Sequence, residues 1–403
     1  MNMNEQMKES EESILHTYNR FPVVFEKGQG CYLYDSEGKE YLDFAAGIAV
    51  NSLGYHYPGY DEALKDQIDK LMHISNLYYN EPIIEAGAKL VKASKMSKAF
   101  FTNSGTEAIE GALKAAKKYA YVRDGHADHE IIAMNHSFHG RSIGALSVTG
   151  TAHYREPFEP LMGGVKFADF NDLESVKAQI TDKTCAIITE VVQGEGGIYP
   201  AKKEFLEGLR QICDEKDIML IFDEIQCGMG RTGHYFAWQA YGVQPDIMTS
   251  AKALGCGVPV GAFVLNEKAA KASLEPGDHG TTYGGNPFVC AAVSKVFDIY
   301  ENDKIIEHVQ EMTPYLEQKL DEIVAKHECA ATRRGMGFMQ GIVIQGRPVG
   351  EVVKAALAKG LLVISAGSDV LRIVPPLVIT KEHIDKMAAI LDECMEYFSE
   401  SSK

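Results

Sequence analysis

An apolar run of five residues, IMLIF at positions 218–222, places the strongest constraint on how this chain can fold. Every position in the run is apolar, which is typical of a strand that is buried on both faces of a parallel sheet. Similar runs recur at 98–101, 130–134, 185–189 and 247–249, with helical patterns at 106–121 and 203–216. This alternation, from about residue 98 to 266, predicts an α/β fold in which helices cover both faces of a mostly parallel sheet.

The segments on either side of this region predict further elements, most of which belong to a smaller α+β domain. Residues 30–43 indicate a β-hairpin around a Ser-Glu-Gly turn, and a helical pattern begins at residue 60. After a long amphipathic helix at 305–326, strand and helix patterns alternate to a last helix that starts near residue 381. We therefore predict three units: an N-terminal segment at 1–55 that packs with the small domain, a large domain at 56–300 and a small C-terminal domain at 301–403.

Composition excludes several classes of partner. The 403 residues carry a net charge of −16, which argues against binding to nucleic acid or to an anionic membrane surface. The first 14 residues are polar and acidic, unlike a signal peptide, and no apolar run approaches the length of a membrane span. The eight cysteines are scattered without metal-ligand spacing, so we expect buried free thiols and no metal site. Together these features predict a cytoplasmic protein.

Two chemically distinctive residues follow neighbouring predicted strands. Asp223 comes directly after the 218–222 run, and Lys252 lies among small residues just after the run at 247–249. Strand ends of this kind meet the ligand crevice of an open α/β sheet. Pyridoxal phosphate (PLP) needs a lysine for covalent attachment and an acid that keeps its ring nitrogen protonated. The pair therefore fits a PLP site, although an ordinary salt bridge would show the same two residues.

Three other features lie at strand ends and admit two interpretations each. Ser104, Gly105 and Thr106 join a strand to a helix, which makes either an anion cradle or a plain N-cap. Phe138 could stack on a flat ring or simply belong to the core, and Arg141 could bind a carboxylate or remain solvated. Taken together with Asp223 and Lys252, they supply the contacts that PLP requires.

The sequence GMGRTG at 228–233 matches the dinucleotide-binding pattern GxGxxG. That fingerprint requires the glycines to lie between a strand and a well-formed helix, with an acid about 20 residues further on. Here four residues, DEIQ, separate the strand from Cys227 and the glycines, and the following HYFAWQAYG is short and aromatic. We therefore do not assign this segment to a nucleotide.

Six segments together resemble the class III PLP-dependent aminotransferases. They are FTNSGTEA, NHSFHGRS, ITEVVQGEGG, FDEIQCGMGRTG, the segment around SAKALG, and HGTTYGGNP. The resemblance covers nearly the whole chain in the same order. It implies PLP-dependent transferase fold type I, PLP as cofactor, and a homodimer whose active sites are shared between subunits.

The resemblance also implies roles for individual residues towards the cofactor. Gly105 and Thr106 would hold its phosphate, with Thr282 reaching it from the partner subunit. Phe138 would stack on its ring. Asp223 would pair with the ring nitrogen, and Gln226 would bond to the phenolic oxygen. Lys252 would attach to the aldehyde.

Towards substrates, the resemblance implies that Arg141 and Thr281 contact a carboxylate region, while Glu195 and Arg372 form a switchable pair. The expected acceptor is 2-oxoglutarate and the expected donor is N2-acetyl-L-ornithine. The loop AAGIAVN at 45–51 lacks the tyrosine associated with a free α-amino group, which favours an acylated donor. Ornithine, succinylornithine, succinyl-diaminopimelate and 4-aminobutyrate remain alternative donors. An aminomutase and a non-catalytic PLP-binding protein are alternatives of a different class. Val191 stands where relatives often have proline, with little expected effect.

Overall fold

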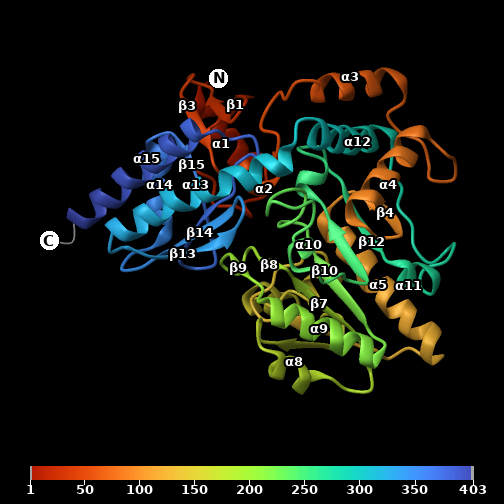
Figure 1. Ribbon diagram of the computed structural model, residues 1–403. Coiled ribbons are helices and arrows are strands. Elements are labelled where there is room, and N and C mark those ends of the chain that lie inside the picture. Colours follow the sequence, from red (N-terminus) through yellow and green to blue (C-terminus); the bar gives the residue numbers. More distant parts are fainter. Residues whose placement is uncertain (1, 401–403) are drawn as a thin grey trace.

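The computed structural model describes residues 2–400, with the side chains of residues 2–396. Residue 1 and residues 401–403, at the ends of the first and third predicted units, lie outside the described residues. A seven-stranded sheet forms the centre of the molecule (Figure 1). Its spatial order is β4 (Lys98–Thr102), β12 (Gly261–Leu265), β11 (Ile247–Ser250), β10 (Met219–Asp223), β7 (Thr184–Glu190), β5 (Glu130–Met134) and β6 (Val165–Ala168).

The predicted mostly parallel sheet is confirmed. The five strands from β11 to β6 are parallel to one another, and β12 alone runs antiparallel to both of its neighbours. Successive residues of β10 point to opposite faces: Met219 and Ile221 pack with α5 (Gly105–Asp124), and Leu220 and Phe222 share a core with α9 (Lys203–Lys216). Because both faces are covered, every residue of β10 is buried, as its unbroken apolar run predicts.

Other helices complete the cover of the central sheet. α8 (Leu173–Gln179) packs on β6, while α12 (Pro287–Asn302) packs against α3 (Tyr60–Lys70) and α4 (Glu81–Ser94). The shorter elements of this part are α6 (Ile143–Ser147), α7 (Ala152–Arg155), η1 (Glu156–Phe158), β8 (Val192–Gln193), β9 (Tyr199–Pro200), α10 (Trp238–Tyr241), η2 (Lys252–Leu254) and α11 (Glu267–Lys271).

The C-terminal quarter forms a second, antiparallel sheet with its own helices. The order is β13 (Ala330–Met336), β14 (Met339–Ile344), β17 (Val370–Ile373) and β16 (Ile364–Ala366). The helices of this part are α13 (Ile305–Lys326), α14 (Val349–Ala358) and α15 (Lys381–Glu400). Arg372 lies in β17, whose four residues are all buried.

The N-terminal strands join this C-terminal part (Figure 1). β1 (Phe25–Gln29), β2 (Tyr32–Asp35), β3 (Glu40–Asp43) and β15 (Leu361–Leu362) form one sheet, in which β3 and β15 are parallel. The predicted hairpin is confirmed as β2 and β3, but β1 was not predicted. Two short helices, α1 (Met3–Ser13) and α2 (Ala46–Ala49), flank these strands in sequence. The unit boundaries at 55 and 300 remain a prediction.

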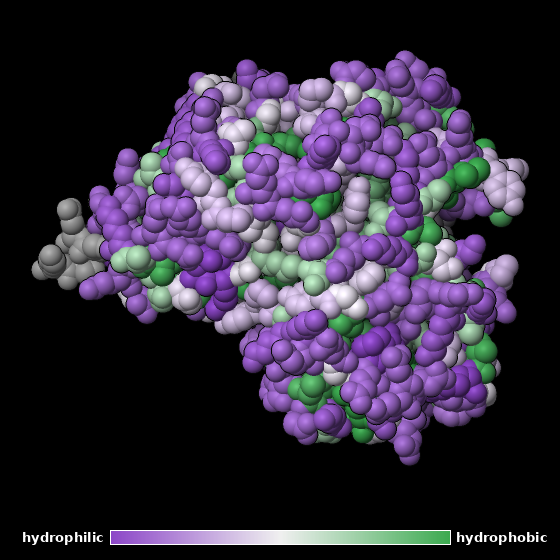
Figure 2. All heavy atoms as spheres, in the orientation of Figure 1, coloured by the Kyte–Doolittle hydropathy of each residue, from purple (hydrophilic) through white to green (hydrophobic). Residues whose placement is uncertain are grey.

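The face of the molecule in Figure 2 is mostly hydrophilic, with apolar residues in small separate areas. Within the described part of the chain, none of the helices has the length and apolar character needed to cross a bilayer. All eight cysteines are free, and all but Cys329 are buried, as predicted. Burial raises the pKa of the Cys213 thiol above its ordinary range, so a structural role in the core explains this residue.

Candidate active site

The ends of four parallel strands and the start of α5 surround a cavity of about 480 Å³. Parallel strands present their carboxyl ends at one edge of a sheet, which is where an α/β fold binds ligands. Eight of the residues singled out in the sequence line this cavity: Ser104, Gly105, Thr106, Phe138, Arg141, Asp223, Gln226 and Lys252. Segments more than 140 residues apart in the sequence therefore meet in one place.

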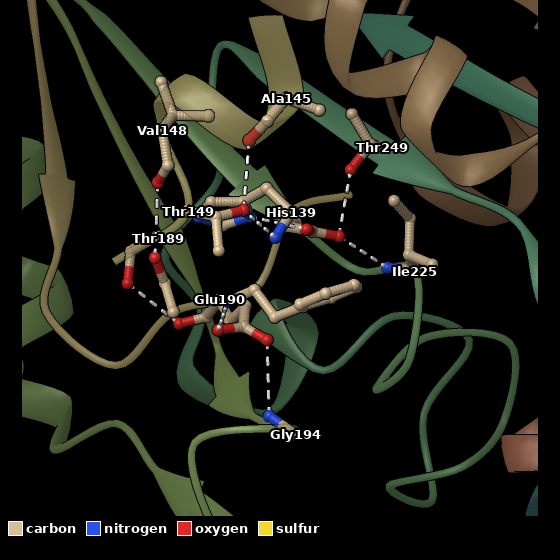
Figure 3. Close-up of polar contacts among 12 residues, drawn as sticks. His139, Ala145, Val148, Thr149, Thr189, Glu190, Gly194, Ile225 and Thr249 are labelled. Atoms are coloured by element: carbon tan, nitrogen blue, oxygen red, sulfur yellow. Dashed lines mark hydrogen bonds and ion pairs between the residues drawn. The ribbon is translucent and has the colours of Figure 1, made fainter. Parts of the chain in front are cut away.

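Asp223 ends β10 and is only 4% exposed. Its Oδ1 accepts hydrogen bonds from the Ile225 backbone N–H (3.0 Å) and the Thr249 hydroxyl (3.2 Å). Its Oδ2 lies 2.7 Å from His139 Nδ1 (Figure 3). Thr249 is positioned by the parallel register that pairs it with Asp223. Three partners therefore fix the direction in which this carboxyl faces the cavity.

Lys252 begins the short helix η2 directly after β11, with a φ of +51°. Such a left-handed backbone is uncommon for a residue other than glycine, and it is often found at functional turns. Burial, followed by the nearby charge of Arg372, lowers the pKa of the Lys252 amine from 10.5 to about 8, although surrounding carboxylates oppose the shift. A substantial fraction of this amine is therefore neutral and nucleophilic near pH 8.

The N-terminus of the twenty-residue helix α5 opens onto the cavity through Gly105 and Thr106. Ser104 caps the helix, since its side chain accepts from the Glu107 N–H, so the N-cap interpretation and the cradle are compatible. Gly140 passes close by with a φ of +139°, and a Cβ there would lie 2.4 Å from Thr106 Oγ1. Only glycine fits this approach. Free N–H groups and the helix dipole make the corner suitable for an anion.

Phe138 and Arg141 come from the loop that follows β5. Phe138 lines the cavity, and the Arg141 guanidinium lies 4.0 Å above the Tyr154 ring and 5.3 Å from the Phe138 ring centroid. Arg141 itself is exposed, so its charge is available to a ligand that enters from solvent.

Glu195 and Arg372, which the family resemblance pairs, form an ion pair. Arg372 is 3% exposed, and its Nη1 contacts Glu195 Oε1 at 2.5 Å and Gln226 Oε1 at 3.1 Å. Burial opposes ionisation of Glu195, yet the charge of Arg372 and its hydrogen bond hold the pKa of that carboxyl below its ordinary value. Because Gln226 also lines the cavity, it connects the ion pair with the cavity wall.

Four of the predicted residues lie outside the lining of this cavity: Glu195 and Arg372, which reach it through Gln226, and Thr281 and Thr282. Thr281 is linked to it through Asn103, whose Nδ2 lies 3.3 Å from Thr281 Oγ1. Thr282 is exposed on the surface of the same loop. The neighbouring segment carries large exposed apolar side chains, among them Leu77 (86%) and Tyr79 (95%). Asn76 joins the two segments through a hydrogen bond to the Gly284 carbonyl.

Three buried groups near the site were given no role from the sequence. His139 belongs to the NHSFHGRS segment, and its position next to Phe138 after a predicted strand is the signal that marks it in the sequence. Glu190 lines the cavity at the end of β7. Glu224 follows Asp223 but turns away, accepting from the backbone N–H groups of Ala237 and Trp238 at 2.8 Å each. The end of β10 therefore contributes one carboxyl to the cavity rather than two.

The GMGRTG segment holds the two parts of the chain together. Arg231 is 1% exposed, and its Nη1 donates to the carbonyls of Phe338 and Pro375. No long helix follows the glycines among the described residues, since α10 spans only four positions. This arrangement matches the prediction that the segment is not a dinucleotide site.

One group in the described part of the chain has metal-ligand chemistry: Asp124, His126 and His129, at the C-terminal end of α5. Both carboxylate oxygens of Asp124 are engaged by Arg123 at 2.6 Å. The Arg123 guanidinium therefore already pairs with the carboxylate that a metal ion would need. These residues do not line the cavity.

The residues present fit PLP. The Lys252 amine with its lowered pKa and the Asp223 carboxyl with its three partners line one cavity together with the start of a long helix. The amine suits the aldehyde of PLP, the carboxyl suits its protonated ring nitrogen, and the helix N-terminus suits its phosphate.

Comparison with known proteins identifies the same family. The family model "Aminotransferase class-III" matches residues 14–395. The chain is 47% identical to acetylornithine aminotransferase of Clostridium acetobutylicum over 388 residues, covering 96% of this chain and all of the relative. It is 44% identical to succinylornithine transaminase of Yersinia pseudotuberculosis, with 94% of each chain covered.

A solved structure gives the same result for the fold. Ornithine aminotransferase from Toxoplasma gondii, whose active site holds PLP at partial occupancy, superimposes with a TM-score of 0.95 at 28% identity. The match covers 99% of this chain and 95% of that structure. The predicted fold type I is therefore confirmed, and the chain belongs to the class III aminotransferases, with pyridoxal phosphate as its cofactor.

Proposed function

We propose that the protein transfers the terminal amino group of N2-acetyl-L-ornithine to 2-oxoglutarate, giving N-acetyl-L-glutamate 5-semialdehyde and L-glutamate. This is a step of arginine biosynthesis, which we place in the cytoplasm. The observation that carries the proposal is the half-buried Lys252 in the cavity that Asp223 also lines, with the Glu195–Arg372 pair connected to it through Gln226. Identity of 47% to an acetylornithine aminotransferase supports the choice of donor.

Bound PLP supplies an electron sink for the pair of electrons left when the donor carbon loses its proton. Asp223, whose carboxyl is oriented by Thr249, Ile225 and His139, would pair with the ring nitrogen and keep it protonated. The Lys252 amine would act as the general base that removes the proton from the donor carbon. Its lowered pKa, about 8, suits a base that operates near neutrality.

Ser104, Gly105 and Thr106 would hold the phosphate through the start of α5, and Phe138 would stack on the ring. Gln226 would hold the phenolic oxygen. We assign Arg141 and Thr281 to the carboxylate that both substrates carry far from the reacting carbon. Arg372 would bind the second carboxylate, which only the glutamate and 2-oxoglutarate pair carries close to that carbon. Glu195 would mask Arg372 while the donor is bound.

We further propose a homodimer in which Thr282 reaches the phosphate of the partner subunit. Thr282 is exposed, and the adjacent apolar residues include Leu77, Tyr78, Tyr79 and Tyr283, each at least 61% exposed. Exposed apolar groups of this size mark an interaction surface. Sedimentation velocity should give a dimer for the parent and a monomer for the double variant Leu77→Asp, Tyr79→Asp. A parent that sediments as a monomer while binding PLP normally would contradict this assembly.

Amine-donor profiling with 2-oxoglutarate tests the function. We expect the highest kcat/KM for N2-acetyl-L-ornithine among acetylornithine, succinylornithine, ornithine, succinyl-diaminopimelate and 4-aminobutyrate. Preference for another of these amines would correct the donor but not the reaction. Turnover that needs no amino acceptor would indicate an aminomutase, and binding of PLP without turnover of any amine would contradict the proposal.

A further inference from the structure

Glu190 is a buried carboxyl for which the proposed chemistry has no use. It ends β7, pairs in register with Asp223 of β10, and lines the cavity while being only 5% exposed. Two carboxyl groups at the ends of adjacent strands thus meet in one water-poor site. Burying two carboxyl groups is costly unless each is hydrogen-bonded, so the partners of Glu190 point to its task.

The contacts of Glu190 indicate that task. Its Oε2 lies 3.4 Å from the Phe138 backbone N, and its Oε1 lies 3.3 Å from the Gly194 backbone N. Figure 3 shows the bond to Gly194 reaching from the end of the strand to the following loop. Phe138 presents its ring to the cavity, whereas Gly194 directly precedes Glu195. One side chain therefore connects two loops, each of which carries a residue of the site.

The second loop has little freedom to move by itself. A Cβ at Gly194 would lie 2.4 Å from Gln226 Nε2, so the backbone of this loop is packed directly against Gln226. Gln226 in turn accepts a hydrogen bond from Arg372. A displacement of Gly194 would consequently disturb both members of the Glu195–Arg372 pair.

We propose that Glu190 is a positioning residue that fixes the Phe138 ring and the Glu195 loop relative to each other. The link couples the cofactor's stacking partner to the residues that choose between the two substrates. This inference rests on the proposed function only where it concerns the two substrates; the part that concerns the cofactor stands without it.

Protonation is consistent with this role. Burial, and then the adjacent Asp223, raises the pKa of Glu190 well above its ordinary value, although the two backbone N–H groups oppose the shift. The raised pKa favours the neutral form of Glu190. Both oxygens of a neutral acid still have lone pairs that accept hydrogen bonds. Glu190 can hold the two loops without placing a second negative charge beside Asp223.

Three variants separate positioning from space filling. Glu190→Leu keeps a similar volume and removes both hydrogen bonds. Glu190→Gln keeps the shape and neutrality, but its amide NH₂ replaces one acceptor and faces a backbone donor, so only one link survives. Thr189→Val is the matched control, because it removes a neighbouring buried hydrogen bond to the Glu190 carbonyl and leaves both links in place.

Each variant is purified with PLP bound and measured in two ways. Circular dichroism of the bound cofactor, without substrate, reports how the ring is held. Single-turnover kcat/KM values for acetylornithine and for 2-oxoglutarate report substrate choice as a ratio. For Glu190→Leu we expect a changed dichroism per bound PLP and a ratio shifted by about tenfold, the scale of losing buried hydrogen bonds. Glu190→Gln should also change at least one of the two readouts, but by a smaller amount than Glu190→Leu. Thr189→Val should give the same dichroism and the same ratio as the parent protein.

The inference is overturned if folded Glu190→Leu keeps the parent dichroism and a ratio within about twofold. It is also overturned if Thr189→Val changes both readouts as much as Glu190→Leu does. Should the leucine variant fail to fold, Glu190→Gln decides: no change in either readout refutes positioning. If the parent bound PLP but transaminated no donor, the proposed function would fail, while the dichroism would still test Glu190.

Discussion

Replacing Arg372 by alanine tests how one site accepts two different substrates. The guanidinium is buried, and it donates to both Glu195 oxygens, to Gln226 and to the Ser365 carbonyl. In the proposed reaction, 2-oxoglutarate brings a carboxylate next to its reacting carbon and the amine donor does not. Arg372→Ala should therefore damage the 2-oxoglutarate half-reaction far more than the donor half-reaction.

The magnitude follows from the bonds that would be lost. Each hydrogen bond to a charged group contributes about 1.5–3 kcal/mol, and a bidentate arginine–carboxylate contact contains two. Competition with Glu195 for the same guanidinium reduces the net gain, so we expect a loss of about 3–4 kcal/mol. That loss corresponds to a decrease of about 10²- to 10³-fold in kcat/KM for 2-oxoglutarate. The donor half-reaction should change by less than about tenfold, because the Glu195 side chain is 25% exposed and can be hydrated.

Single-turnover absorbance measurements of the bound cofactor follow each half-reaction separately. Two variants serve as comparisons. Arg141→Ala should weaken both half-reactions, because both substrates carry the distant carboxylate. Glu195→Gln should weaken the acetylornithine half-reaction and favour glutamate-like ligands. Equal losses in both half-reactions for Arg372→Ala and for Glu195→Gln would refute the switch, and would indicate a static ion pair instead.

Four further predictions concern the residues that follow the strand ends. Asp223→Asn should lower turnover by about 10²-fold or more, because a neutral amide cannot keep the ring nitrogen protonated; turnover within about fivefold of the parent would assign the role elsewhere. His139→Phe should lower turnover by about tenfold, because it removes the 2.7 Å contact between His139 and Asp223. His139→Asn should retain more turnover than His139→Phe, because its amide can still bond to Asp223. Equal losses of turnover in the two variants would indicate that His139 acts by packing alone. PLP attachment to the cofactor-free protein should accelerate as pH rises and level off above about 8, the lowered pKa of Lys252, whereas an unshifted amine would keep accelerating towards pH 10.5. The same shift also affects stability, because between pH 8 and 10.5 the unfolded chain keeps the Lys252 proton and the folded protein does not. Lys252 therefore makes the free energy of unfolding of the cofactor-free protein increase with pH over that window. Denaturation curves of Lys252→Met should lack this increase.

Much of the fold could be predicted because burial leaves a clear signature in the sequence. The unbroken apolar runs predicted β5 and β10, and periodicity predicted α9 and α13 with their observed ends. β1 was missed: its residues, FEKGQ, are largely exposed and carry no apolar alternation. Its position depends on pairing with β2, a contact that local sequence does not reveal.

The site was partly predictable for a related reason. Asp223 and Lys252 stand at strand ends with chemistry that few other arrangements require, and both line the cavity. His139 and Glu190 could not be assigned, because their roles depend on partners 84 and 52 residues away in the sequence. Glu224 shows that neighbours in the sequence can lie in different sites. It directly follows Asp223, but its side chain contacts the loop at Ala237, because successive side chains along a strand point in opposite directions.

The most direct test is to locate the cofactor on the chain. After reduction of the PLP-bound protein with borohydride and proteolysis, mass spectrometry should find the cofactor mass on the peptide that contains Lys252. Lys252→Ala should fold, lose that adduct and show no transamination. An adduct on another lysine of the parent protein, or transamination that persists in Lys252→Ala, would contradict the assignment of this cavity as the catalytic site.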